Sequence, residues 1–143
     1  MALKSIAIVW ACAALAQGIG AEFAQCTNLV PGYKNNEWVF PRAFCKNKAF
    51  DMWIVTELNL SQCFTLDDGN LVPASNQSPG ISACTDCYVG VLNIMYCNCP
   101  ANNGTMIFAL TKLPDTITND DGYLACFDQR STFIEATPYP ASS

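Results

Sequence analysis

The side chains of this chain that could carry chemistry are carboxylates and cysteines. Its 143 residues include twelve acidic residues, nine Cys and no His. Without His, the chain lacks the usual acid–base group near neutral pH and the commonest metal ligand. This excludes His-dependent catalytic triads and ordinary zinc catalysis.

Carboxylate-only hydrolysis would need two acidic groups roughly 5–10 Å apart across a substrate bond. The paired acidic residues here are sequence neighbours, in the triplets Asp67-Asp68-Gly69 and Asp120-Asp121-Gly122. Neighbours on a tight turn do not face each other across a substrate, so we expect no enzymatic activity. The triplets also lack the spaced oxygen ligands and the distal Glu of a calcium loop, so we expect no metal or other cofactor. The formal net charge of -5 gives no electrostatic footprint for nucleic-acid binding.

The first twenty residues are typical of a secretory signal peptide. Lys4 precedes an apolar run from Ile6 to Ala16, and small residues follow up to Gly20 and Ala21. The run is too short to span a membrane, and no later stretch of about 18 apolar residues suggests a span. We therefore expect residues 1–20 to be removed and the protein to be secreted into the extracellular space.

The cysteines outside this leader are even in number, which in an oxidising compartment predicts up to four disulfides. Four of them, Cys84, Cys87, Cys97 and Cys99, could be mistaken for a zinc site, but in a secreted chain bridges are favoured. These cysteines are Cys26, Cys45, Cys63, Cys84, Cys87, Cys97, Cys99 and Cys126. Secretion would also expose three N-glycosylation candidates, Asn59, Asn76 and Asn103, of which Asn76 is weakened by the nearby Pro79.

The chain repeats itself. Residues 60–72 (LSQCFTLDDGNLV) align with residues 113–125 (LPDTITNDDGYLA), with Leu, Asp-Asp-Gly and Leu at matching positions. Upstream, Cys26 matches Cys84 and Cys45 matches Cys99. We therefore expect one domain over residues 21–127, built from a first repeat at about 23–72 and a second at about 81–127.

Local signals within each repeat predict strands rather than helices. Each Asp-Gly pair lies between apolar residues and predicts a hairpin with a type I′ turn, which needs positive φ at both central residues. Runs such as 36–45, 52–60, 88–97 and 105–113 are rich in β-branched and aromatic residues. Pro41 predicts an edge position or bulge in the first run. The Leu-led segments 60–63 and 113–116 predict single helical turns, residues 72–80 a joining loop, and residues 128–143 a loose tail.

These features together resemble a cyanovirin-N homology domain. The opening is similar to that family's Phe-x-Gln-x-Cys-x-Asn pattern with one residue deleted, and its Ala-x-Cys strand end is met at Cys45 and, less fully, at Cys99. The family's Leu-led turn pattern is complete in the second repeat and departs in the first, where Leu66 stands in place of Asn. The resemblance covers about residues 23–127. The residues that match the opening and the complete turn are Phe23, Gln25, Cys26, Asn28, Leu113, Ile117, Asn119, Asp121, Gly122 and Leu124.

The resemblance implies an all-β, elongated, pseudo-two-fold fold, in which each half combines a three-stranded sheet from one repeat with a hairpin from the other. It also implies a lectin without catalysis that binds mannose-rich or related oligosaccharides in shallow pockets at the two far ends. Two site sets follow from it. The first site would use Gln25, Lys46, Asn47, Lys48, Asn119 and Asp121. The second would use Thr65, Asp68, Ser75, Asn76, Gln77, Asn102 and Asn103.

We rank the first site above the second. Leu66 removes a polar partner beside Asp68, and glycans on Asn76 or Asn103 would occupy the mouth of the second pocket. Asp, Asn and Gln supply the acceptors and donors that sugar hydroxyls need. Asn and Asp are also ordinary turn residues, so a purely structural role stays open for each of them.

In the resembled fold, Cys26–Cys45 and Cys84–Cys99 hold equivalent hairpins. Cys87 and Cys97 would then face each other inside the second pair, which leaves Cys63 with Cys126. Cys63–Cys87 with Cys97–Cys126 remains the alternative.

Two further questions stay open at the level of sequence. The functional alternative to a lectin is a secreted cysteine-rich effector or interaction protein that binds a protein partner. The chain could be a monomer or, through exchange of hairpins, a domain-swapped dimer.

Overall fold

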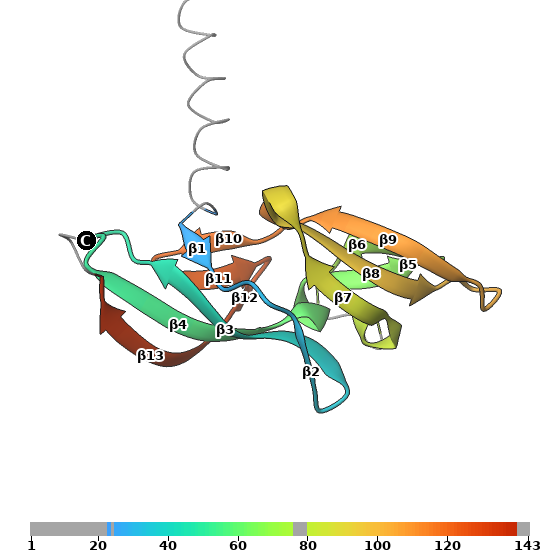
Figure 1. The fold of residues 1–143 in the computed structure, drawn as a ribbon, viewed down its shortest axis with the longest axis horizontal. Coiled ribbons are helices and arrows are strands. Elements are labelled where there is room, and N and C mark those ends of the chain that lie inside the picture. Colours follow the sequence, from blue (N-terminus) through green and yellow to red (C-terminus); the bar gives the residue numbers. More distant parts are fainter. Residues whose placement is uncertain (1–22, 24, 76–79, 140–143) are drawn as a thin grey trace, which may run out of the picture.

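The computed structural model describes residues 23, 25–75 and 80–139, which form an elongated all-β molecule (Figure 1). The predicted leader, residues 1–20, lies outside the described residues. The elements in chain order are β1 (Cys26–Thr27), β2 (Gly32–Lys34), β3 (Glu37–Lys46), β4 (Met52–Asn59), η1 (Leu60–Gln62), β5 (Phe64–Asp67), β6 (Asn70–Pro73), η2 (Gly80–Ala83), β7 (Thr85–Val89), η3 (Val91–Asn93), β8 (Ile94–Pro100), β9 (Met106–Lys112), η4 (Leu113–Asp115), β10 (Thr118–Asp120), β11 (Tyr123–Cys126), β12 (Gln129–Arg130) and β13 (Thr132–Pro138).

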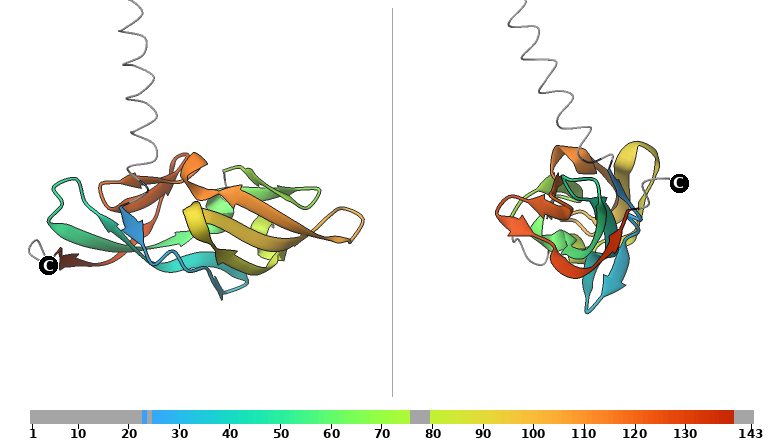
Figure 2. Two further views of the ribbon diagram at one scale, coloured as in Figure 1. Left: turned by 45° about the horizontal axis from the view of Figure 1, so that its top comes forward. Right: turned by 90° about the vertical axis from the view of Figure 1, so that its left-hand side faces the viewer.

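Two sheets lie end to end along the long axis (Figures 1 and 2). The first has the order β1-β3-β4-β13, with β2 also paired to β3, and the second has the order β7-β8-β9. The hairpin β10–β11 of the second repeat packs on the first sheet, and the hairpin β5–β6 of the first repeat lies beside β9 of the second. The expected exchange of hairpins between the two halves is confirmed.

The core consists of matching positions in the two repeats. Leu60 and Leu113, which open the 3₁₀ turns η1 and η4, are fully buried. The matching pair Phe64 and Ile117 is fully buried too, and Leu71 and Leu124 pack beside them. Burying a side chain of this size stabilises the fold by about 1.5–3 kcal/mol, so the repeated apolar pattern contributes much of the stability of the core.

The chain joins the two repeats covalently and by hydrogen bonds. The structure contains the bridges Cys26–Cys45, Cys84–Cys99, Cys87–Cys97 and Cys63–Cys126. The first pairing scheme is therefore confirmed, and the alternative Cys63–Cys87 with Cys97–Cys126 is wrong. The indole N–H of Trp38 donates to the carbonyl of Cys84 at 2.9 Å, which ties β3 to the start of β7.

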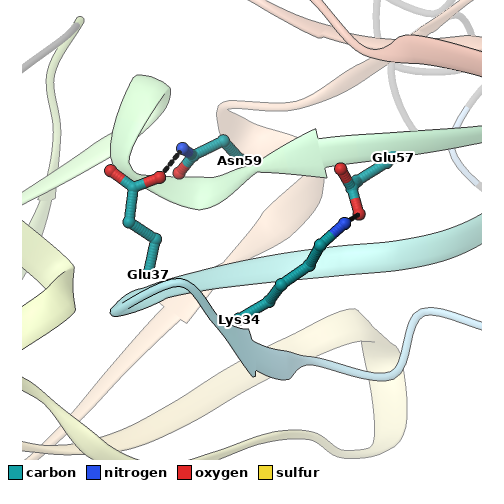
Figure 3. A network of polar contacts seen from close by, with 4 residues as sticks. All are labelled: Lys34, Glu37, Glu57 and Asn59. Carbon is teal, nitrogen blue, oxygen red and sulfur yellow. Dashed lines mark hydrogen bonds and ion pairs between the residues drawn. The ribbon is translucent and has the colours of Figure 1, made fainter.

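The β2–β3 hairpin is held against β4 by side chains (Figure 3). Lys34 on β2 forms an ion pair with Glu57 on β4 at 2.9 Å. Glu37 at the start of β3 accepts a hydrogen bond from the side-chain amide of Asn59 at the end of β4. Pro41 lies within the register shift between Phe40 and Ala43, which confirms the expected bulge in this strand.

The prediction of a loose tail from residue 128 is wrong for residues 129–138. Gln129–Arg130 pairs with β11, and Thr132–Pro138 forms β13 along the free edge of β4. Thr, Phe and Ile at 132–134 favour a strand, and β4 offers an unpaired edge of backbone groups that a strand can satisfy. The first sheet is therefore larger than the expected three strands.

The run 88–97 also differs from a single strand. It divides into the end of β7, the turn η3 and the start of β8, with Leu92 and Asn93 at φ of +60° and +55°. The outer face of the resulting sheet carries stacked rings of Tyr88, Tyr96 and Phe108, with centroids 5.1 and 5.4 Å apart.

Candidate functional site

The hairpin β10–β11 reaches across to the first half of the molecule at its turn. Asp121 and Gly122 have φ of +52° and +97°, so both central residues are positive as a type I′ turn requires. A Cβ on Gly122 would lie 2.3 Å from Cγ1 of Ile54 on β4, closer than real Cβ contacts. The turn therefore rests directly on the first sheet, beside the loop that joins β3 to β4.

A cavity of about 190 Å³ lies where this turn meets that loop. We call it the hairpin cavity. It is lined by Gln25, Lys46, Asn47, Lys48, Phe50, Asn119 and Asp121. All six residues predicted for the first site thus line one cavity, although they come from both repeats. Phe50 was not among the predicted residues. It is half exposed, and an aromatic ring within a polar loop was the signal in the sequence that could have identified it.

Two of the predicted ligands are also the anchors that attach the hairpin to the loop. One carboxylate oxygen of Asp121 accepts the backbone N–H of Lys48 at 2.8 Å. The side-chain amide of Asn119 donates to the carbonyl of Lys46 at 3.0 Å, and its oxygen accepts the N–H of Gly122 at 2.7 Å. The contacts with Lys48 and Lys46 join residues 73 apart in the sequence and fix the walls of the cavity.

The β3–β4 loop is closed by Asn47. Its side-chain oxygen accepts the N–H groups of Asp51 and Met52, both at 3.1 Å. Its side-chain amide donates to the carboxylate of Asp51 at 2.8 Å. Beneath the loop, the N–H of Lys46 donates to the carbonyl of Gln25 at 3.1 Å. The loop that carries Lys48 and follows Lys46 is therefore held in one conformation at its two ends.

Aromatic rings surround the ammonium group of Lys46. Its Nζ lies 4.2 Å from the ring centroid of Tyr139, 5.5 Å from that of Trp53 and 6.0 Å from that of Phe50. Trp53 lies in β4, whereas Tyr139 directly follows β13. Tyr139 was not predicted to lie here, because its segment was expected to form a tail.

The structure describes five of the seven residues predicted for the second site and joins Asp68 to the β8–β9 loop. Asp68 and Gly69 form the equivalent turn between β5 and β6, with φ of +50° and +86°. Asp68 accepts the N–H of Asn102 at 2.8 Å, and Asn103 follows in the same β8–β9 loop. Thr65 lies near the start of β5, away from this turn. A Cβ on Gly80 would be 3.3 Å from the hydroxyl oxygen of Thr65. Ser75 follows β6, and Asn76 and Gln77 lie outside the described residues.

The glycosylation candidates differ in their surroundings. The side-chain nitrogen of Asn59, the atom to which a glycan would be attached, donates to Glu37 (Figure 3). The side-chain oxygen of Asn59 accepts the N–H of Ser61 in η1. In Asn103 the oxygen accepts the N–H of Thr105 at 3.0 Å, and the residue is exposed. Of these two side chains, that of Asn103 is the more exposed, while Asn76 lies outside the described residues.

A larger cavity of about 430 Å³, which the sequence analysis missed, lies between the β2–β3 hairpin and the segment that joins η2 to β7. Tyr33 and Trp38 form its aromatic wall, with centroids 5.2 Å apart, and Asp86 lies at its edge. The Tyr33 hydroxyl and the Trp38 indole both donate to backbone carbonyls. These hydrogen bonds hold the two aromatic side chains in place between the repeats.

Within the described part of the chain, no group of three or more Cys, Asp or Glu side chains is placed to hold a metal ion. No described helix has the length and apolar character needed to cross a membrane.

Comparison with known proteins agrees with this architecture. The model of the CVNH domain family matches residues 24–125. Among solved structures, the CVNH protein of Gibberella zeae is similar with a TM-score of 0.59 and 18% identity, over 75% of this chain and 97% of that one. The CVNH protein of Neurospora crassa has a TM-score of 0.59 and 15% identity, over 71% and 93% of the two chains. Microvirin, solved as a complex with mannobiose, has a TM-score of 0.52 and 23% identity, over 73% and 95%.

None of the curated proteins compared matches this chain. The family match extends over both repeats, and the exchanged hairpins and the duplicated Asp-Gly turns are those expected of the resembled fold. The chain belongs to the cyanovirin-N homology (CVNH) family.

Proposed function

We propose that this protein is a secreted lectin without catalytic activity and that the hairpin cavity binds a sugar ring of a mannose-type or related oligosaccharide. Membership of the CVNH family and the similarity to microvirin, a protein solved with mannobiose, support carbohydrate binding. The leader-like residues 1–20 and the four disulfides support secretion, because such bridges persist in oxidising compartments.

One observation carries the proposal: six polar residues from separate parts of the chain line one preformed cavity together with an exposed aromatic ring. Sugar recognition needs fixed polar groups for the hydroxyls and an apolar surface for the ring, and Phe50 supplies the latter. The volume of about 190 Å³ is below the roughly 300–1,000 Å³ of sites for drug-sized ligands, which suits a single sugar ring.

The first site is ranked above the second for reasons that the contacts support. Leu66 on β5 is partly buried and packs against the core, so it offers a sugar hydroxyl no hydrogen bond. Asn103 is an exposed glycosylation candidate in the loop that Asp68 holds. A glycan there would compete with any external sugar at the second site.

A glycan array tests the proposal with the oxidised protein lacking residues 1–20. We expect binding to mannose-containing oligosaccharides, inhibited by free mannobiose and unchanged by EDTA. As a matched pair, Asn119→Ala should weaken the signal because it removes one of the two anchors between the loop and the hairpin, whereas Asn102→Ala in the other half should retain it. A folded protein with no signal on any glycan would overturn the proposal.

A second candidate function, binding of a protein partner, is favoured by one observation. The outer face of β7-β8-β9 exposes the apolar side chains of Tyr88, Met106, Phe108 and Leu110, which are 50–58% accessible. Exposed apolar patches of this kind mark interaction surfaces in many soluble proteins. An empty glycan array would favour this function over the lectin.

A further inference from the structure

Most side-chain acceptors that line the hairpin cavity already form hydrogen bonds within the protein. The side-chain oxygen and nitrogen of Asn47 both form hydrogen bonds within the β3–β4 loop. Those of Asn119 form hydrogen bonds to Gly122 and Lys46. One oxygen of Asp121 is taken by the N–H of Lys48. The cavity therefore offers a ligand few side-chain acceptors.

Its remaining polar groups are mainly donors. Across the described residues, three cationic side chains form ion pairs, namely Lys34, Arg42 and Arg130. Lys46 and Lys48, which both line the cavity, are not among them. Against these two cations the cavity lining contributes one carboxylate, that of Asp121, so its formal charge is +1 in a chain of formal charge -5.

The position of one of these cations is defined. The ammonium of Lys46 lies over the rings of Tyr139, Trp53 and Phe50. Rings attract the cation without neutralising it and without using its N–H donors as a carboxylate would. Tyr139 lies beyond residues 24–125, so a segment outside the matched family domain helps to position the Lys46 ammonium.

We propose that the hairpin cavity prefers sugars that carry an anionic group, a carboxylate or a phosphate, over the corresponding neutral sugars. This inference rests on the proposed lectin function. A hydroxyl needs both a donor and an acceptor, whereas an anionic group accepts only, so it matches a cavity rich in donors. Hydrogen bonds between an ammonium and an anionic oxygen are also roughly twice as strong as those between neutral groups.

Titration calorimetry with matched sugar pairs tests the preference. The pairs are methyl α-mannoside with mannose 6-phosphate, and methyl glucoside with glucuronic acid, which separate the phosphate from the carboxylate. We expect at least one anionic member to bind about tenfold more tightly than its neutral partner. The difference should shrink when salt is raised from about 0.05 to about 0.5 M.

Four variants test whether the preference arises in the cavity. Lys48→Gln should reduce it to about threefold or less, and Lys48→Arg should retain it. Lys112→Gln is the matched control, because this exposed lysine lies on β9 in the other half of the molecule and also forms no ion pair among the described residues. A preference that persists in Lys48→Gln and in Lys46→Gln would overturn the assignment.

The outcomes separate this inference from the proposed function. Equal binding of neutral and anionic sugars would leave the lectin function intact and overturn the preference. Inorganic phosphate that binds as tightly as mannose 6-phosphate would show an anion site rather than a sugar site and would also overturn it. Failure of the folded protein to bind any glycan would overturn the lectin function and the preference with it.

Discussion

Asp68 and Asp121 occupy equivalent positions in the two repeats and make equivalent contacts. Each carboxylate accepts a backbone N–H from a loop of the opposite repeat at 2.8 Å, Asn102 in one case and Lys48 in the other. The repeat alignment could predict that these residues share a role. It could not predict which atoms they bond, because the partners are 34 and 73 residues away in the sequence.

We expect Asp121→Ala to weaken sugar binding more than Asp68→Ala. Loss of the bond to Lys48 frees the loop that lines the hairpin cavity, and an interaction of this kind contributes about 1–3 kcal/mol, or about tenfold in affinity. Both variants should also melt at a lower temperature, because each loses an anchor between repeats. Calorimetry with a mannose oligosaccharide measures the first effect, and melting curves measure the second.

The ranking of the two sites depends on this comparison. If Asp68→Ala abolishes binding while Asp121→Ala binds like the parent, the functional cavity is at the other end of the molecule.

The glycines of the turns differ in what surrounds them, which allows a matched test. Gly104 and Gly122 both have positive φ, +86° and +97°. A Cβ on Gly104 meets nothing within 4 Å, whereas one on Gly122 would overlap Ile54. Gly104→Ala should therefore cost about 1–2 kcal/mol of unfolding free energy for the backbone alone, and Gly122→Ala about 3 kcal/mol or more.

Urea unfolding of both variants gives these costs directly. Equal costs would show that the hairpin does not press on β4 as the structure describes.

At the scale of elements, the sequence predicted those strands that the repeat duplicates. Each hairpin turn carries Asp-Gly, each 3₁₀ turn begins with a buried Leu, and the bulge occurs at Pro41. The turn η3 was missed because Gly90, its N-cap, stands within an apolar β-prone run, and the positive φ falls on Leu92 and Asn93 rather than on a glycine. Strand β13 was missed because it has no counterpart in the first repeat, and its reason to form is the open edge of β4.

Truncation after Asp128 tests the contribution of β13. The shortened chain loses the pairing with β4, the ion pair between Arg42 and Glu135 and the contact between Trp53 and Tyr139. We expect the melting temperature to fall by roughly 10 °C or more, since a loss of 1 kcal/mol lowers it by about 4–8 °C in a small domain.

A chain that ends at Tyr139 is the control and should melt like the full protein. If the chain truncated after Asp128 melts at the same temperature as this control, β13 does not stabilise the first sheet.

At the scale of the whole molecule, each half is incomplete without a hairpin from the other repeat. The first sheet is covered by β10–β11, and the second lies against β5–β6. The candidate site follows from this exchange, because the hairpin cavity has one wall from each repeat. The sequence could predict its six polar members through the family resemblance, but not the ring of Tyr139, whose position depends on the fold of the C-terminal segment.

The four disulfides should therefore contribute unequally to stability. Cys63–Cys126 joins the end of η1 to β11 across a sequence separation of 63 and is the bridge that links the two repeats. Cys87–Cys97 has a separation of 10 and lies inside the loop that Cys84–Cys99 already closes. Restricting the unfolded chain stabilises by about 4 kcal/mol for a loop of the first length and by no more than about 3 kcal/mol for the second, less still when the loop is nested.

Paired Cys→Ala replacements test this difference. The variant without Cys63 and Cys126 should lose more unfolding free energy in urea than the variant without Cys87 and Cys97, and its cooperative transition should broaden as the halves separate. Non-reducing peptide maps confirm that the other three bridges stay intact in each variant. If the Cys87 and Cys97 variant is the less stable of the two, loop restriction is not what these bridges contribute, and the packing of Cys87 and Cys97 within the second sheet outweighs it.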